Sequence, residues 1–316
     1  MLPEPAAPEP ELLTEPATSP AVAETRPSAI APLWHTLLLI AAIAAYSFWG
    51  AQRFHPPALD PLAPVPHQAK QAATAHPGYD AQRLIRYALS GVLELIVVAW
   101  VWLGLRLRRV SLRSLLGKIP RDLNAITLEA GVAALFWISS MTVLFILALA
   151  WQAGATAIYH HQQEQAKQQQ SQSPSSAAPS PVSPEKKQLE TIRELLELAP
   201  ANGLEIAAWG ALCLIVGFSE ELAFRGYLQS QGVALLHSMP LGVLLSAVVF
   251  GFAHGYQGLR GMVLIGAFGA MFSIITLMRR SLSPGILAHA WHDFFMGLML
   301  AFIRATHMLD KLHISG

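Results

Sequence analysis

Three short polar sequences interrupt the hydrophobic C-terminal third of the chain. They are GFSEELAFRG at 217–226, VVFGFAHGYQG at 248–258 and ILAHAWHDFFMG at 286–297. Each contains carboxylate or imidazole side chains, the groups that most often transfer protons in hydrolysis. A charged side chain inside a membrane span costs a few kcal/mol, so its presence there indicates a functional site.

In the first sequence, Glu221 and Arg225 are four residues apart and can pair on one face of a helix. Glu220 is rotated by about 100° from Glu221 and therefore points elsewhere. This spacing predicts that the arginine neutralises one acid and leaves the other acid for chemistry. The alternative is an ion pair at the membrane interface that anchors the end of the helix.

In the second sequence, His254 follows Phe250 by four residues, so the imidazole and the phenyl ring share a helical face. In the third, His289 and Asp293 have the same spacing and lie within hydrogen-bonding reach; His292 is a weaker candidate. The alternatives are a packing histidine at position 254 and a His–Asp pair that only satisfies itself inside a helix bundle.

The three sequences together supply the groups that a hydrolytic site in a bundle core requires. A carboxylate and an imidazole can hold and deprotonate a water molecule, and a second imidazole can stabilise an oxyanion. This combination predicts amide hydrolysis without a serine or cysteine nucleophile. Glu220, His254 and His289 could instead ligate zinc with an open position for water. The residue types leave both possibilities open.

The composition indicates that helices in a membrane position these residues. The chain has 316 residues, of which 53% are hydrophobic and only 13% are charged, whereas soluble domains average about 25% charged residues. The mean hydropathy is +0.41. A formal net charge of +1 excludes a strongly basic nucleic-acid-binding protein. Cys213 is the only cysteine, so neither an intrachain disulfide nor a cysteine-based zinc cluster can form.

A membrane-spanning helix needs roughly 20 mostly apolar residues. Seven segments fit this requirement: 33–51, 87–105, 129–151, 204–218, 241–257, 259–278 and 285–303. An eighth span is expected if 219–238 re-enters the membrane. The sequence therefore predicts an all-α, polytopic membrane helix bundle of about seven or eight transmembrane helices.

Composition also divides the chain into four parts. They are a disordered Pro/Glu-rich tail at 1–32, a membrane region of three spans at 33–152, a Gln/Ser/Pro-rich spacer with a short amphipathic helix at 153–200, and a catalytic membrane region at 201–316. The basic segment 106–121 predicts a cytoplasmic loop between the second and third spans. The N-terminus is then cytoplasmic, and the first polar sequence lies near the cytoplasmic face.

The three polar sequences match the EExxxR, FxxxH and HxxxN/D motifs in order. Over about 204–304 the chain resembles the CPBP family, the CAAX proteases and bacteriocin-processing enzymes also called Abi proteins. The resemblance implies an intramembrane endopeptidase similar to the type II CAAX prenyl protease. It implies that Glu220 and His254 activate the water and that His289 and Asp293 form the oxyanion hole.

The resemblance also assigns supporting roles to Glu221, Arg225 and Phe250. It favours a glutamic-type mechanism without a cofactor over a zinc-dependent one. An asparagine in the last motif can donate a hydrogen bond, whereas an ionised Asp293 cannot. Either Asp293 is protonated through burial, or it orients His289 and leaves the oxyanion to the imidazole.

The expected partners are the lipid bilayer and a peptide or protein substrate, either prenylated or with a bacteriocin-like leader, and no nucleic acid. The expected location is the plasma membrane. One alternative is a non-proteolytic membrane scaffold or bacteriocin-immunity protein that retains the motifs. Another is a proton- or ion-coupled transporter, although the chain has no detectable internal repeat of the kind common in transporters.

Overall fold

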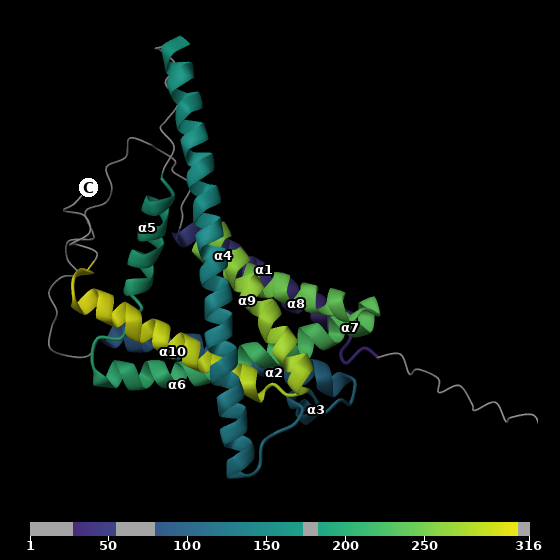
Figure 1. The fold of residues 1–316 in the computed structure, drawn as a ribbon. Helices are drawn as coiled ribbons and strands as arrows, with labels where there is room; N and C mark the ends of the chain where they lie inside the picture. Colours follow the sequence, from purple (N-terminus) through teal and green to yellow (C-terminus); the bar gives the residue numbers. More distant parts are fainter. Residues whose placement is uncertain (1–27, 55–79, 173–182, 309–316) are drawn as a thin grey trace, which may run out of the picture.

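A computed structural model describes residues 28–54, 80–172 and 183–308. The predicted tail lies almost entirely outside the described residues. The described residues form helices and no strand (Figure 1), which confirms the all-α prediction. Six helical segments among them are long and apolar enough to cross a membrane, and a seventh apolar helix, Met239–Ala253, is shorter. The chain is therefore a polytopic helical bundle.

The N-terminal half contributes α1 (Leu33–Phe54), α2 (Ala81–Leu107), the short α3 (Leu112–Leu116) and α4 (Leu123–Gln172). α2 begins earlier than the sequence predicted because Asp80 caps it: the Asp80 carboxylate accepts hydrogen bonds from the backbone N–H groups of Gln82 and Arg83. α1 is anchored by His35, whose Nδ1 lies 2.8 Å from the hydroxyl of Tyr227.

α4 is longer than the predicted third span. It is one helix of 50 residues, roughly 75 Å long at 1.5 Å per residue, and it extends beyond its neighbours (Figure 1). The segment 160–172, which we assigned to the Gln/Ser/Pro-rich spacer, is therefore helical. The physical reason is that 155–172 has no Gly or Pro and is rich in Gln and Ala, which favour helix.

The amphipathic helix expected at 189–199 is present as α5, Pro184–Leu196. It starts earlier because Ser183 caps it, accepting a hydrogen bond from the N–H of Lys186, and a proline occupies the first turn. No residue of α5 is fully buried. The helix therefore lies on the outside of the described bundle, beside α4 and α10 (Figure 1).

The fourth span does not end near residue 218, as the sequence predicted. α6 (Gly203–Glu220), the π-helix η2 (Glu221–Leu228) and α7 (Gln229–Leu236) follow without a break, so 203–236 is one apolar helical segment. The 219–238 segment is its continuation and not a separate re-entrant span. All eight residues of η2 are buried, and π-helical turns are frequent at functional sites.

The C-terminal half is completed by α8 (Met239–Ala253), the 3-10 turn η3 (Gly255–Gln257), α9 (Gly258–Arg279) and α10 (Ser283–Ala305). α10 packs closely against α6 at Gly217. A Cβ atom there would lie 3.0 Å from the backbone nitrogen of Ala290 and from the carbonyl oxygen of Ile286. The absent side chain therefore lets the two helices approach at the level of the first and third polar sequences.

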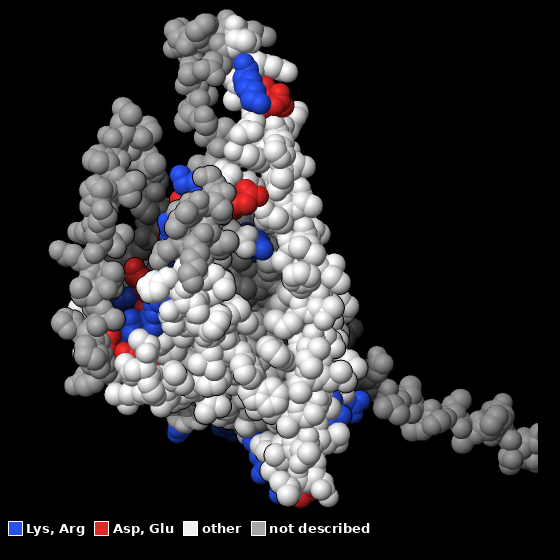
Figure 2. All heavy atoms as spheres, turned by 60° about the vertical axis from the view of Figure 1, so that its left-hand side comes forward, with Lys and Arg blue, Asp and Glu red and all other residues white. Residues whose placement is uncertain are grey.

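The core is centred on η2. Leu222, Ala223, Phe224, Tyr227 and Leu228 are buried there, with residues of α1, α2 and α8 around them. Many large apolar side chains face outward instead, and one side of the molecule carries few charged residues between its two ends (Figure 2). This distribution fits a helix bundle surrounded by lipid.

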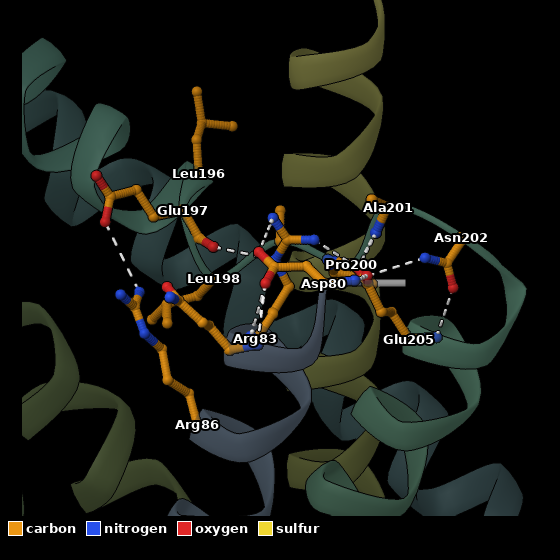
Figure 3. A network of polar contacts seen from close by, with 12 residues as sticks. Asp80, Arg83, Arg86, Leu196, Glu197, Leu198, Pro200, Ala201, Asn202 and Glu205 are labelled. Atoms are coloured by element: carbon orange, nitrogen blue, oxygen red, sulfur yellow. Dashed lines mark hydrogen bonds and ion pairs between the residues drawn. The ribbon is translucent and has the colours of Figure 1, made fainter. Parts of the chain in front are cut away.

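A buried ion pair ties α2 to the start of α6 (Figure 3). The Glu205 side chain is fully buried, and its Oε2 lies 2.6 Å from Nη1 of Arg83. Its two oxygens also accept hydrogen bonds from the backbone N–H groups of Asp80 and Ala201 and from the amide of Asn202. Both carboxylate oxygens are thus satisfied, as a buried charge requires.

The connection from α5 to α6 is held at the same place by side chains of α2 and α10. Arg304 donates to the carbonyl oxygens of Ala199 at 2.7 Å and Pro200 at 2.8 Å. The Tyr87 hydroxyl donates to the carbonyl of Leu198 at 2.5 Å. These contacts fix the end of the bundle where α6 begins, which is the end far from Glu220.

Replacing Glu205 by alanine should lower the free energy of unfolding by about 3 kcal/mol, because a buried charge pair loses one partner. Glu197→Ala is the control: this acid is 73% exposed and lies 3.8 Å from Arg86, so its loss should cost at most about 1 kcal/mol. Unfolding of the detergent-solubilised protein, followed by tryptophan fluorescence, measures both. Equal losses in the two variants would contradict a stabilising role for the buried pair.

Candidate active site

Glu221 and Arg225 form the ion pair that their spacing predicted. Oε1 of Glu221 lies 2.9 Å from Nη1 of Arg225, and neither side chain is exposed. The pair is therefore buried inside the bundle, in the middle of the 203–236 helical segment and not at one of its ends.

Aromatic rings surround the buried guanidinium. Its central carbon lies 4.2 Å from the ring centroid of Phe250 and 5.1 Å from that of Phe272, within the range of a cation–π interaction. Gly269 provides the space: a Cβ atom there would lie 3.1 Å from Nη2 of Arg225. Phe272 and Gly269 lie on α9, which has none of the three motifs, so no motif pointed to them.

His289 lies between the two glutamates. Its Nδ1 is 2.9 Å from Oε1 of Glu221, and its Nε2 is 3.3 Å from Oε2 of Glu220. Asp293, its predicted partner, is 3.8 Å from Nε2, which is longer than a hydrogen bond. The expected His289–Asp293 hydrogen bond is thus replaced by one from His289 to Glu221, because helix packing brings η2 closer than the next turn of α10.

This geometry constrains where protons lie. Nδ1 of His289 donates to the carboxylate of Glu221, because an unprotonated Nδ1 would face the oxygen with a lone pair. In a neutral imidazole Nε2 then carries no proton, and it would face Oε2 of Glu220 with a second lone pair. A proton between His289 and Glu220 removes this repulsion. The two side chains can therefore exchange a proton.

His254 ends α8. Its Nδ1 lies 2.9 Å from the carbonyl oxygen of Phe250, so the N–H of Nδ1 donates there and Nε2 of the neutral ring can accept a proton. The Phe250 ring centroid is 5.0 Å from that of His254 and 6.0 Å from that of His289. Both imidazoles therefore flank one phenyl ring. Within the described ranges no hydrogen bond or ion pair joins His254 to Glu220.

The remaining candidates lie along α10. The Asp293 side chain is 27% exposed, and its backbone carbonyl accepts a hydrogen bond from the indole of Trp209 at 3.2 Å. His292 is turned toward α4: its Nδ1 accepts a hydrogen bond from the indole of Trp137 at 3.4 Å. His292 is thus engaged on a different face of α10 from His289.

The donor set offers no ready metal site. In the part of the chain that the structure describes, no group of three or more His, Cys, Asp or Glu side chains is arranged to hold a metal ion. Glu220, His254 and His289 therefore do not form a ligand cluster in this arrangement, and contacts to Glu221 and Phe250 already engage Nδ1 of both histidines.

Replacing Arg225 by methionine should lower the free energy of unfolding by about 3–5 kcal/mol, since Glu221 would remain buried without its cation. The double variant Glu221→Gln/Arg225→Met should be more stable than Arg225→Met alone, because no uncompensated charge remains. Unfolding of detergent-solubilised wild type, Glu221→Gln, Arg225→Met and the double variant measures this. A double variant whose loss equals the sum of the two single losses would contradict the coupling.

A comparison with known protein families matches the segment of the chain that contains these residues. Residues 202–295 match the family described as type II CAAX prenyl endopeptidase Rce1-like. The match includes Glu220, Glu221, His254, His289 and Asp293. No curated protein and no solved structure matches the chain. The match covers 94 of the 316 residues, and over this segment it confirms the resemblance that the motifs indicated.

Proposed function

We propose that this chain is a glutamic-type intramembrane endopeptidase in which Glu220 and His254 activate the attacking water. The family match supports a CAAX-protease-type endopeptidase in general. The observation that carries the proposal is the position of His289, which joins Glu220 to the buried Glu221–Arg225 pair. A carboxylate and imidazoles that can exchange protons are what a water-activating site needs.

In the proposed reaction a water molecule bound by Glu220 and His254 attacks the carbonyl carbon of the scissile peptide bond. A C–O bond forms, and one proton of the water moves to Glu220 or to Nε2 of His254. The tetrahedral intermediate then collapses as the C–N bond breaks. The same proton passes to the leaving nitrogen, so the products are a carboxyl group and an amine.

His289 is proposed to stabilise the oxyanion of the intermediate. With Nδ1 donating to Glu221, a proton on Nε2 can be donated to a developing negative oxygen. Asp293 lies beyond hydrogen-bonding distance of Nε2, which favours an electrostatic role through His289. Glu221, which is paired with Arg225, fixes the imidazole of His289 by a hydrogen bond, and the Phe250 ring lies between the two histidines.

We propose that the basic end of the bundle faces the cytoplasm. The segment 106–121 and the basic turn at 279–280 lie together: the backbone N–H of Lys118 donates to the carbonyl of Arg280 at 3.1 Å, and Gly117 and Ser281 form an isolated bridge. Several Lys and Arg side chains lie along the lower end of the molecule in Figure 2, and others lie on its left-hand side and near its top. The positive-inside tendency then places this end, and the N-terminus, in the cytoplasm of a plasma-membrane protein.

The test is cleavage of quenched-fluorescent peptides, prenylated CAAX and leader-like peptides included, by purified protein in detergent. Glu220→Gln and His254→Ala should each lower kcat by about 10²–10⁴-fold, and His289→Ala by about 10²–10³-fold. His292→Ala is the matched control on the same helix and should retain activity. Comparing prenylated with unprenylated peptides shows whether the lipid is recognised.

Two outcomes would overturn this mechanism. Loss of wild-type activity with a strong zinc chelator, and recovery on adding zinc, would establish a metalloprotease. If no peptide is cleaved and a cellular phenotype of the gene survives Glu220→Gln, the chain acts as a scaffold or immunity protein.

A further inference from the structure

α1 turns polar and small residues toward the protein and large aromatic residues away from it. Its buried positions include His35, Thr36, Ser47 and Gly50. Its positions that are more than half exposed include Trp34, Tyr46, Phe48 and Trp49. Burying polar groups costs free energy unless they make specific contacts, so the inner face of α1 indicates a specific role. None of the three motifs lies on α1, and the family match at 202–295 does not reach it.

The first turn of α1 holds the π-helix η2 through Tyr227. Nδ1 of His35 lies 2.8 Å from the Tyr227 hydroxyl, and Oγ1 of Thr36 lies 2.9 Å from it. α2 in turn holds the imidazole: its ring stacks on that of Trp100 at a centroid distance of 4.3 Å, and a Cβ atom at Gly104 would lie 2.7 Å from its Nδ1. The position of His35 relative to η2 is therefore closely defined by packing.

The residues just before α1 are tied to the same helical segment. The side chain of Gln231, on α7, accepts hydrogen bonds from the backbone N–H groups of Ile30 at 2.9 Å and Ala31 at 3.2 Å. It also donates to the carbonyl of Ala31 at 2.8 Å. Because η2 and α7 continue α6, which ends at Glu220, the N-terminal end of α1 is fixed to the segment that carries the proposed catalytic acid.

The other end of α1 contacts η3, the turn that follows His254. The three atoms nearest to a Cβ atom built at Gly255 all belong to Ser47: its hydroxyl oxygen would collide with that Cβ, and its own Cβ would lie 3.5 Å away. Further along α1, a Cβ atom at Gly50 would lie 3.4 Å from Cβ of Tyr256. α1 therefore contacts the segments of both proposed water-activating residues.

We propose that α1 fixes the position of His254 relative to Glu220, with His35 as a positioning residue at one end and Ser47 at the other. This inference rests on the proposed function, in which Glu220 and His254 hold one water molecule. Within the described ranges no hydrogen bond or ion pair joins the two side chains, so the elements that carry them set their separation. A displacement of about 1 Å in a catalytic site can lower the rate on the order of 10²-fold.

The first test acts at the η3 end. Gly255→Ala places a methyl group against the Ser47 hydroxyl, and the backbone there does not have a positive φ that alanine would strain. kcat should fall on the order of tenfold with KM nearly unchanged, because the catalytic groups move. Adding Ser47→Ala removes the hydroxyl and should restore most of the lost kcat. Unchanged kcat in Gly255→Ala, or no recovery in the double variant, would overturn the proposal.

The second test acts at the η2 end. His35→Leu and Tyr227→Phe each remove the contact between the two side chains and should lower kcat on the order of tenfold. His35→Asn keeps a polar group near the position of Nδ1 and should retain most of the activity. Trp34→Leu is the matched control, since this neighbouring ring is 53% exposed. Equal losses in His35→Leu and His35→Asn would contradict a role for the polar contact.

A double variant tests whether the two ends act through one helix. His35 and Ser47 are 12 residues apart, about 18 Å along α1, and changes at such a distance usually act independently. If α1 links them, His35→Leu lets α1 shift and relieves the collision at Gly255. His35→Leu/Gly255→Ala should then be several-fold faster than the product of the two single effects predicts. A kcat equal to that product would overturn the link.

Hydrogen–deuterium exchange, measured by mass spectrometry in detergent, does not depend on the activity of the protein. The N–H of Gln257 donates to the carbonyl of His254 at 2.9 Å, so its exchange reports opening of η3. Exchange at 254–257 should rise several-fold in His35→Leu and in Tyr227→Phe, and stay at the wild-type level in Trp34→Leu. Unchanged exchange in His35→Leu would overturn the role of α1. The expected exchange together with unaltered kcat in Glu220→Gln would overturn only the proposed function.

Discussion

Oε1 of Glu221 accepts two charge-assisted contacts, from Nη1 of Arg225 and from Nδ1 of His289, each at 2.9 Å. This single oxygen therefore links η2 to α10 inside the bundle. Because the carboxylate is fully buried, separating it from either partner exposes an uncompensated charge to apolar surroundings. The position of His289 beside Glu220 follows from this link, and every role that we propose for the site depends on it.

The apolar residues around the pair make the link stronger. Phe250 and Phe272 cover the guanidinium of Arg225, and Gly285 packs where a Cβ atom would lie 3.1 Å from Oε2 of Glu221. Such packing keeps water away, and the attraction between charges increases as the dielectric falls. Because water is excluded around the pair, a proton of these groups can move only between neighbouring side chains. The contact between His289 and Glu220 allows such a transfer.

The sequence predicted the features that depend on spacing within one segment. The helical class, most of the apolar spans and the Glu221–Arg225 pair follow from periodicity and from i, i+4 geometry. The hydrogen-bond partner of His289 could not be predicted from spacing. Asp293 and Glu221 are both candidate partners, and the packing of α6 against α10 determines that His289 bonds to Glu221. The unbroken 203–236 segment was missed because the buried charges in 220–225 lower its hydropathy. In the structure Arg225 pairs with Glu221 within the segment, and His289 contacts both glutamates.

The region before residue 202 contributes contacts that position the helices of the matched family segment. Arg83 joins α2 to Glu205 at one end of α6, and Ser219 joins the other end of α6 to the backbone at Glu94. Glu205 and Ser219 are 14 residues apart on α6, which is about 21 Å along the helix at 1.5 Å per residue. The two contacts therefore fix both the rotation and the register of α6 against α2. Since Glu220 follows Ser219 directly, that register sets the direction of its carboxylate. The geometry of the site is therefore determined jointly by α2, which lies outside the family match, and by the helices that carry the motifs.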